Sequence, residues 1–209
     1  MVISKLLSRQ ARKPSGLFGK WIIVFLFDKG NAELNRFVSE MVDIREKEHV
    51  LEIGFGTGFL IRLLSKQIKS GVIEEIDFSK TMFSVALKKN RKQIQTGKVK
   101  LSLGNFDEVP FEKTSFDKIF TVNTLYFWEN PSDQIKKIAT LLKSGGTILI
   151  AFEDETMLKR KPLDPNVFNY YSKEAVVSFL SQGNQFTNVH IESRKLGVSL
   201  FHCITAVKI

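Results

Sequence analysis

Strand-like and helical segments alternate along most of the chain, and this alternation constrains the fold more than any other feature of the sequence. Short apolar runs lie near residues 50–53, 72–76, 99–103, 116–122 and 147–152, and most of the segments between them repeat apolar residues at helical spacing. Parallel strands require such helical crossovers, which are right-handed and cover the faces of the sheet. We therefore predict an α/β fold, a Rossmann-like three-layer sandwich.

The end of the chain departs from this alternation. A helix is expected at about residues 172–181, and two strand-like runs, residues 188–193 and 199–208, follow it with only residues 194–198 between them. A connection this short joins antiparallel strands. The prediction is a seven-stranded, mostly parallel sheet with an antiparallel last strand.

Residues 1–44 precede the alternation, and we expect them to form an N-terminal helical cap or lid on a single compact domain, residues 45–209. One short helix is predicted at about residues 19–28. A second begins near residue 31 and places four apolar side chains on one face, Leu34, Phe37, Val38 and Met41.

The apolar run at residues 21–27 bears on whether the chain enters a membrane. It has seven residues, whereas a helix that spans a bilayer needs ~20. No cleavage site typical of a secretory signal follows it. We predict a cytoplasmic protein without a transmembrane segment, and the basic residues before this run leave an interfacial membrane contact open.

Cysteine and histidine content limits the chemistry that the chain can perform. Cys203 is the single cysteine, which excludes an internal disulfide framework, and a terminal strand favours a buried thiol. His49, His190 and His202 lack the spacing of a metal site, so no metal is predicted.

The formal net charge of +9 is local, because the basic residues gather in residues 1–20 and 88–100. Such runs are typical of solvated helix ends and loops, and no zinc knuckle or recognition helix accompanies them. Nucleic acid is therefore not the favoured partner.

The segment from Glu52 to Gly58 carries the strongest chemical signal. It follows the first predicted strand directly and contains glycines at 54, 56 and 58. Glycine lets the backbone turn and approach a ligand without a Cβ in the way. The helix after Gly58 offers free amide groups at its first turn.

Two kinds of cofactor compete for such a turn. A dinucleotide site has the spacing G-x-G-x-x-G, whereas here Phe59 stands at the third-glycine position. The carboxylate of Glu52 would repel a pyrophosphate, but it would attract the sulfonium and ammonium groups of S-adenosylmethionine. The charges favour the methyl donor, and a nicotinamide cofactor is only a remote alternative.

Residues 50–58 resemble the first motif of class I S-adenosylmethionine-dependent methyltransferases, and similar landmarks follow in order to about residue 152. The resemblance implies that the cofactor S-adenosyl-L-methionine lies against the turn, with S-adenosyl-L-homocysteine as product. The residues that it assigns to the cofactor here are Glu52, Gly54, Phe55, Gly56 and Gly58.

The segment Glu75–Met82 is similar to the end of the family's second strand, where an acid binds the ribose hydroxyls. By that similarity Asp77 is the ribose ligand, and Phe78 and Met82 join the cofactor site. Glu75 is the alternative, since alternation along a strand places it on the same face as Asp77. Ser79 is expected to begin a helix with four residues turned inward, Met82, Phe83, Ala86 and Leu87.

Asn105 stands where the family has an acid that contacts adenine, which is a departure from the pattern. An asparagine carbonyl can still accept a hydrogen bond from the adenine amino group, so we expect binding with altered affinity. Phe106 is expected to offer its backbone amide to the same ring.

Asn123 and Tyr126 follow the fourth strand in a segment that in this family faces donor and acceptor, and they are the candidate catalytic residues. Asn123 is also a candidate cofactor residue. No proline follows it, which argues against methylation of an exocyclic base amine. A general base is optional for displacement at a carbon that a sulfonium already activates.

The favoured function is transfer of a methyl group to a small-molecule or lipid-like acceptor, with an acceptor pocket shaped by Trp21, Phe25 and Phe27. RNA or ribosomal methylation through the basic surface, and a non-catalytic module that binds S-adenosylmethionine, are the alternatives. The sequence determines neither the acceptor atom nor the oligomeric state.

Overall fold

The computed structural model describes residues 8–13 and 31–209. Residues 8–12 are helical. The helix predicted at about 19–28, with Trp21, Phe25 and Phe27, lies outside the described residues. The division of the chain at residue 44 therefore stays a prediction.

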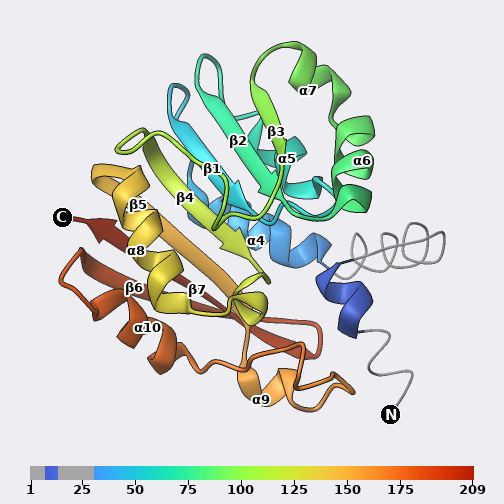
Figure 1. Cartoon of the computed structure of the whole chain (residues 1–209), viewed down its shortest axis with the longest axis vertical. Coiled ribbons are helices and arrows are strands. Elements are labelled where there is room, and N and C mark those ends of the chain that lie inside the picture. The colour runs from blue at the N-terminus through green and yellow to red at the C-terminus, as the bar shows by residue number, and fades with distance from the viewer. Residues whose placement is uncertain (1–7, 14–30) are drawn as a thin grey trace. The chain divides into compact units, whose positions relative to one another are not determined.

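Seven strands form one sheet in the order β3-β2-β1-β4-β5-β7-β6 (Figure 1). The pairs β1–β2, β2–β3 and β4–β5 are parallel, whereas β7 runs antiparallel to both β5 and β6. This confirms the predicted α/β fold and its antiparallel last strand. The bounds are β1 (His49–Ile53), β2 (Val72–Asp77), β3 (Val99–Leu103), β4 (Phe116–Val122), β5 (Leu142–Glu153), β6 (Phe186–Leu196) and β7 (Ser199–Lys208).

The described residues form two compact units, one that ends at Pro110 and one that begins at Phe111 and includes Ser8. The N-terminal unit contains β1 to β3 and the helices α4 (Ala32–Val42), α5 (Phe59–Leu64), α6 (Lys80–Lys89) and α7 (Arg91–Gln95). Helix α4 packs on α5, and α6 packs on β2 and β3.

Two helices of the N-terminal unit show how the predicted apolar faces are used. Leu34, Phe37 and Val38 of α4 are buried as predicted. In α6, Met82 and Ala86 are buried four residues apart, on one face. Leu87 was expected inward, but 43% of its surface is exposed. It stands about 100° around the helix from Ala86, which turns it away from the sheet.

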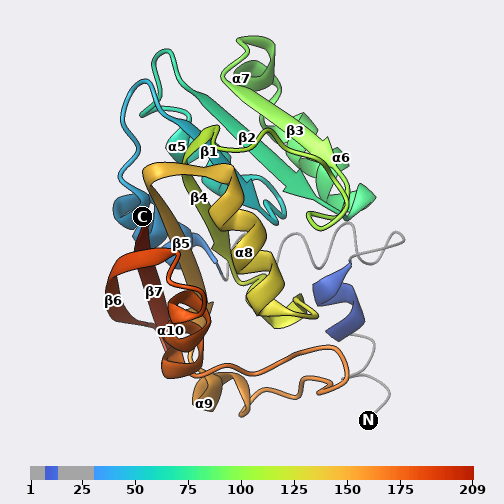
Figure 2. The same cartoon turned by 60° about the vertical axis from the view of Figure 1, so that its left-hand side comes forward.

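The C-terminal unit contains β4 to β7, the 3-10 helix η2 (Leu125–Phe127) and the helices α8 (Pro131–Leu141), α9 (Glu155–Leu158) and α10 (Lys173–Ser181). Helix α8 packs on β5, and α10 packs on α8, β6 and β7, as the turned view in Figure 2 shows. Strand β5 begins at Leu142 rather than near 147, because Leu142 already pairs with Phe116 before a register shift.

Within the parts of the chain that the structure covers, no helix is long and apolar enough to cross a bilayer.

Candidate functional site

The glycine turn after β1 is held by hydrogen bonds to the neighbouring strand. Gly54, Gly56 and Gly58 all have positive φ, a conformation that L side chains seldom adopt. The amide of Gly54 donates to the carbonyl oxygen of Ile76 at 2.7 Å, and the amide of Gly56 donates to Oδ2 of Asp77 at 2.9 Å. The turn is therefore fixed to the carboxyl end of β2.

The second and third glycines are needed for different reasons. A Cβ on Gly56 would meet no atom of the described residues within 4 Å, so the space beside this residue is open to a ligand. A Cβ on Gly58 would lie 2.5 Å from Nδ2 of Asn90 and 2.9 Å from Cβ of Ala86. Gly58 therefore serves the close packing of the turn against α6, and Gly56 leaves room for a bound molecule.

Asp77, the predicted ribose ligand, is the last residue of β2. Its Oδ1 accepts from the amide of Ser79 at 2.8 Å, and its Oδ2 accepts from Gly56. Burial raises the pKa of Asp77 to about 6, although these two amide donors oppose the rise. Each carboxylate oxygen has a second lone pair with which it could accept from a ligand hydroxyl.

Glu52 of β1 and Glu75 of β2 are both buried. Burial raises the pKa of Glu52 to about 7, opposed by a hydrogen bond with Glu75 and assisted by the charge of Asp77. Burial and the neighbouring charge of Glu52 hold the pKa of Glu75 well above its usual range. The site thus gathers acidic groups that suit a cationic ligand and disfavour a phosphate.

The remaining cofactor candidates of the N-terminal unit lie after β2 and β3. Met82 is buried, and its amide donates to Oγ of Ser79, the N-cap of α6. Phe78 is half-buried, with Nζ of Lys13 5.5 Å from the centre of its ring. Asn105 is exposed, and its Oδ1 accepts from the amide of Asp107 at 3.3 Å. Phe106 is buried beside it in the sequence.

Asn123 and Tyr126 belong to the C-terminal unit and contact each other. Asn123 has a φ of 55°, and its amide donates to the carbonyl oxygen of Ala151 at 2.8 Å. The hydroxyl of Tyr126 donates to Oδ1 of Asn123 at 3.0 Å and accepts from the amide of Glu153 at 2.5 Å. Tyr126 therefore joins η2 to the end of β5 and holds the side chain of Asn123.

The state of the Tyr126 hydroxyl limits what it can do. Burial raises the pKa of Tyr126 far above its usual range, and the nearby charge of Glu153 adds to the rise. A phenol that is this difficult to ionise is a poor general base. Its geometry suits a positioning role.

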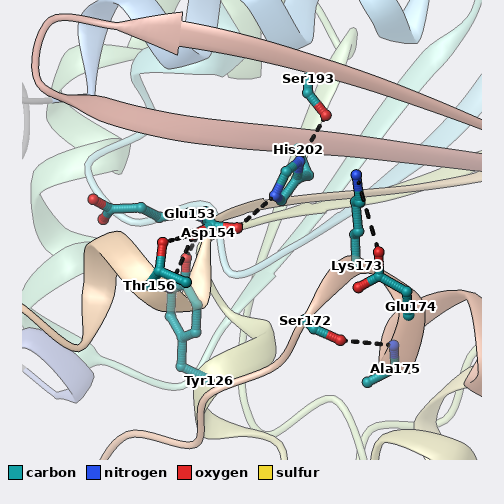
Figure 3. A network of polar contacts seen from close by, with 10 residues as sticks. All are labelled: Tyr126, Glu153, Asp154, Thr156, Ser172, Lys173, Glu174, Ala175, Ser193 and His202. Carbon is teal, nitrogen blue, oxygen red and sulfur yellow. Dashed lines mark hydrogen bonds and ion pairs between the residues drawn. The ribbon is translucent and has the colours of Figure 1, made fainter.

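A polar network that sequence patterns did not indicate continues from Tyr126 along β5 and β7 (Figure 3). Glu153 binds Nζ of Lys161 and accepts from the hydroxyl of Ser199, each at 2.6 Å. His202 is buried, with Nε2 3.1 Å from Oδ2 of Asp154 and Nδ1 2.7 Å from Oγ of Ser193. These partners come from three strands and the loop after β5, so no local motif could reveal them.

Asn90 is a second residue that the sequence did not single out. It is fully buried, and its Nδ2 donates to the carbonyl oxygens of Gly58 and Ala86, each at 3.0 Å. It ties the glycine turn to α6.

Cys203 is buried as predicted, and burial raises the pKa of its thiol to about 12, which makes it a poor nucleophile. In the described ranges, no three side chains of His, Cys, Asp or Glu are grouped to hold a metal ion.

The strand order, the antiparallel β7 and the acidic glycine turn together define a class I methyltransferase fold. The family model described as "Methyltransferase domain" matches residues 51–150. The uncharacterised methyltransferase YdaC of Bacillus subtilis (strain 168) is 25% identical over 178 residues, which cover 85% of this chain and 93% of the relative.

Solved structures show the same fold. A S-adenosylmethionine-dependent methyltransferase from Aquifex aeolicus matches with a TM-score of 0.71 at 21% identity, over 90% of this chain and 98% of that one. Phosphoethanolamine N-methyltransferase 2 of Haemonchus contortus, solved with S-adenosyl-L-methionine, matches with a TM-score of 0.73 at 15% identity, over 88% of this chain and 56% of that one. In sequence and in fold, the chain is thus similar to S-adenosylmethionine-dependent methyltransferases.

Proposed function

We propose that the chain transfers a methyl group from S-adenosylmethionine to a small-molecule or lipid-like acceptor by in-line displacement. The observation that carries the proposal is the link between the Gly56 amide and the Asp77 carboxylate. It sets an acid beside an open glycine turn. The Haemonchus contortus enzyme, also solved with phosphomonomethylethanolamine and S-adenosylhomocysteine, supports a small acceptor.

The donor supplies a methyl carbon that its sulfonium already activates, and the residues of the N-terminal unit would bind and orient it. Asp77 would accept from the ribose hydroxyls, and Glu52 would attract the cationic part of the molecule. Asn105 and Phe106 would contact the adenine ring. Further contacts to the donor would come from Gly54, Phe55, Gly56, Gly58, Phe78 and Met82.

On the acceptor side, we propose that Asn123 contacts the reacting groups and that Tyr126 positions it. The support is the hydrogen bond from the Tyr126 hydroxyl to Oδ1 of Asn123, together with the positive φ of Asn123. We assign no general base, since orientation and exclusion of water supply much of the acceleration in a displacement of this kind.

The Asp77→Ala variant tests the donor site. Loss of one hydrogen bond that a ligand hydroxyl donates to the carboxylate is expected to weaken S-adenosylmethionine binding by about 10- to 100-fold, because such a bond contributes about 1.5–3 kcal/mol. Isothermal titration calorimetry with the donor measures the change.

The matched control is Asp133→Ala, which removes an exposed carboxylate paired with Lys136 on α8 and should leave donor affinity unchanged. Failure of the wild-type protein to bind S-adenosylmethionine would contradict the proposed function. Equal affinity of Asp77→Ala and wild type would contradict only the ribose assignment, and Glu75 would become the candidate.

RNA is the second candidate acceptor, favoured by a specific observation on α6 and α7. Lys88, Arg91 and Lys92 are exposed there, and the sequence carries no acid between Phe78 and Asp107. Binding to RNA whose affinity falls steeply as salt concentration rises would favour this acceptor. Donor binding without methyl transfer to any acceptor would favour the non-catalytic alternative.

A further inference from the structure

Two glutamates lie side by side on neighbouring strands of the N-terminal unit. Glu52 of β1 and Glu75 of β2 are directly opposite in the parallel register. Both are almost completely buried, with 2% and 1% of their surface exposed. Residues opposite each other in adjacent strands point to the same face of the sheet, so the two carboxyl groups share one environment.

The described residues provide little to stabilise two charges at this position. Apart from the two carboxyl groups, which interact with each other, the described residues offer no hydrogen-bond donor to either oxygen of Glu75 or to Oε2 of Glu52. An unpartnered buried carboxylate is strongly destabilising. Either a proton or a cationic ligand must therefore neutralise part of the charge.

Among the residues that the structure describes, no cationic side chain acts on either glutamate. The pKa of Glu75 responds to Glu52 and Asp77, which are both acids. On β3 the residue opposite Glu75 is Leu101, while Lys100 and His49 bind Glu74, the next residue along β2. The basic residues of α6, which packs on β2, are Lys80, Lys88 and Lys89, and none of them acts on either glutamate.

We propose that Glu52 and Glu75 share one proton in the free protein and release it to solvent when a cationic ligand binds at the glycine turn. This inference rests on the proposed function. The carboxyl pair loses one positive charge when the proton leaves and gains one when the ligand binds. The total charge at the site is therefore the same before and after binding. Glu75 therefore allows the site to distinguish between ligands that differ in charge.

The consequence concerns the donor and its product. S-adenosylmethionine carries one more positive charge than S-adenosylhomocysteine, because the sulfonium becomes a neutral thioether when the methyl group leaves. A site that exchanges a proton for a cation binds the donor more tightly as pH rises. Its affinity for the product depends less on pH. The carboxyl pair would thus favour release of the product after transfer.

Calorimetric titration of the full chain with each of the two ligands tests the proposal, between about pH 6 and about pH 7.5. Measurement in two buffers with different ionisation enthalpies gives the number of protons released. We expect S-adenosylmethionine to release about one proton, and its Kd to fall by up to about tenfold per pH unit. S-adenosylhomocysteine should release fewer.

The Glu75→Gln variant removes the shared proton and keeps the shape of the side chain. Its amide can donate a hydrogen bond to Glu52, which favours the ionised form of Glu52 at neutral pH. Proton release by S-adenosylmethionine should fall towards zero, and the dependence of its Kd on pH should flatten. Retained binding of S-adenosylhomocysteine would show that the site is still folded.

The matched control is Glu74→Gln, which makes the same chemical change one residue away and should keep the proton release of the wild type. Equal proton release by wild type and Glu75→Gln, or the same pH dependence for both ligands, would overturn the inference while the proposed function stands. Binding of neither ligand to the wild type would overturn both.

Discussion

At the scale of single residues, glycines that look equivalent in the sequence have different physical roles. Gly56 and Gly58 both have positive φ. Of the two, only Gly58 would bring an added Cβ close to other side chains, those of Asn90 and Ala86. Spacing alone predicts a turn with three glycines. It cannot predict which of them borders open space, because that depends on side chains of α6, about 30 residues further along the chain.

The Gly58→Ala variant should lose about 3 kcal/mol of stability, since left-handed strain adds to overpacking against Asn90. Gly97→Ala is the control, because Gly97 has a φ of 76° and its Cβ would meet nothing among the described atoms within 4 Å. It should lose only about 1 kcal/mol, from strain alone. Urea unfolding measures both, and equal losses would show that packing at Gly58 is unimportant.

At the scale of elements, the start of α6 connects helix stability to the proposed donor site. The side chain of Ser79 accepts from the amide of Met82, while the amide of Ser79 donates to Asp77. Ser79→Ala should destabilise the protein by about 1 kcal/mol, as the loss of an N-cap does. Ser84→Ala, within α6 on its exposed surface, should change stability little. Thermal unfolding compares the two, and a similar effect of both would contradict the capping role.

At the scale of the whole molecule, the buried acids should make the ligand-free protein less stable as pH rises. The pKa of Glu52 is raised to about 7 and that of Asp77 to about 6, both mainly by burial, and burial also holds the pKa of Glu75 well above its usual range. A carboxyl group with a raised pKa contributes stability below its unfolded pKa and loses it as pH rises through the folded pKa. The window therefore runs from about pH 4 to beyond about pH 7.

Thermal unfolding as a function of pH checks this expectation. Each released proton lowers stability by up to about 1.4 kcal/mol per pH unit, or roughly 3–6 °C in Tm for a chain of this size. Glu75→Gln should flatten the decrease. The pKa of Asp154 is lowered to about 2 because hydrogen bonds from Thr156 and His202 outweigh its burial, so its contribution is lost only in strong acid. A Tm that is constant from about pH 5 to about pH 8 would contradict the burial argument.

Local periodicity and short motifs are enough to predict the alternation of strands and helices, the antiparallel last strand and the position of the glycine turn. The folded chain is needed to show that β5 begins at Leu142, that Glu52 lies opposite Glu75, and that the hydroxyl of Tyr126 binds both Asn123 and Glu153. These features depend on register and packing between segments far apart in the chain. Local patterns show which residues share a face of one element, but not which residues of another element they meet.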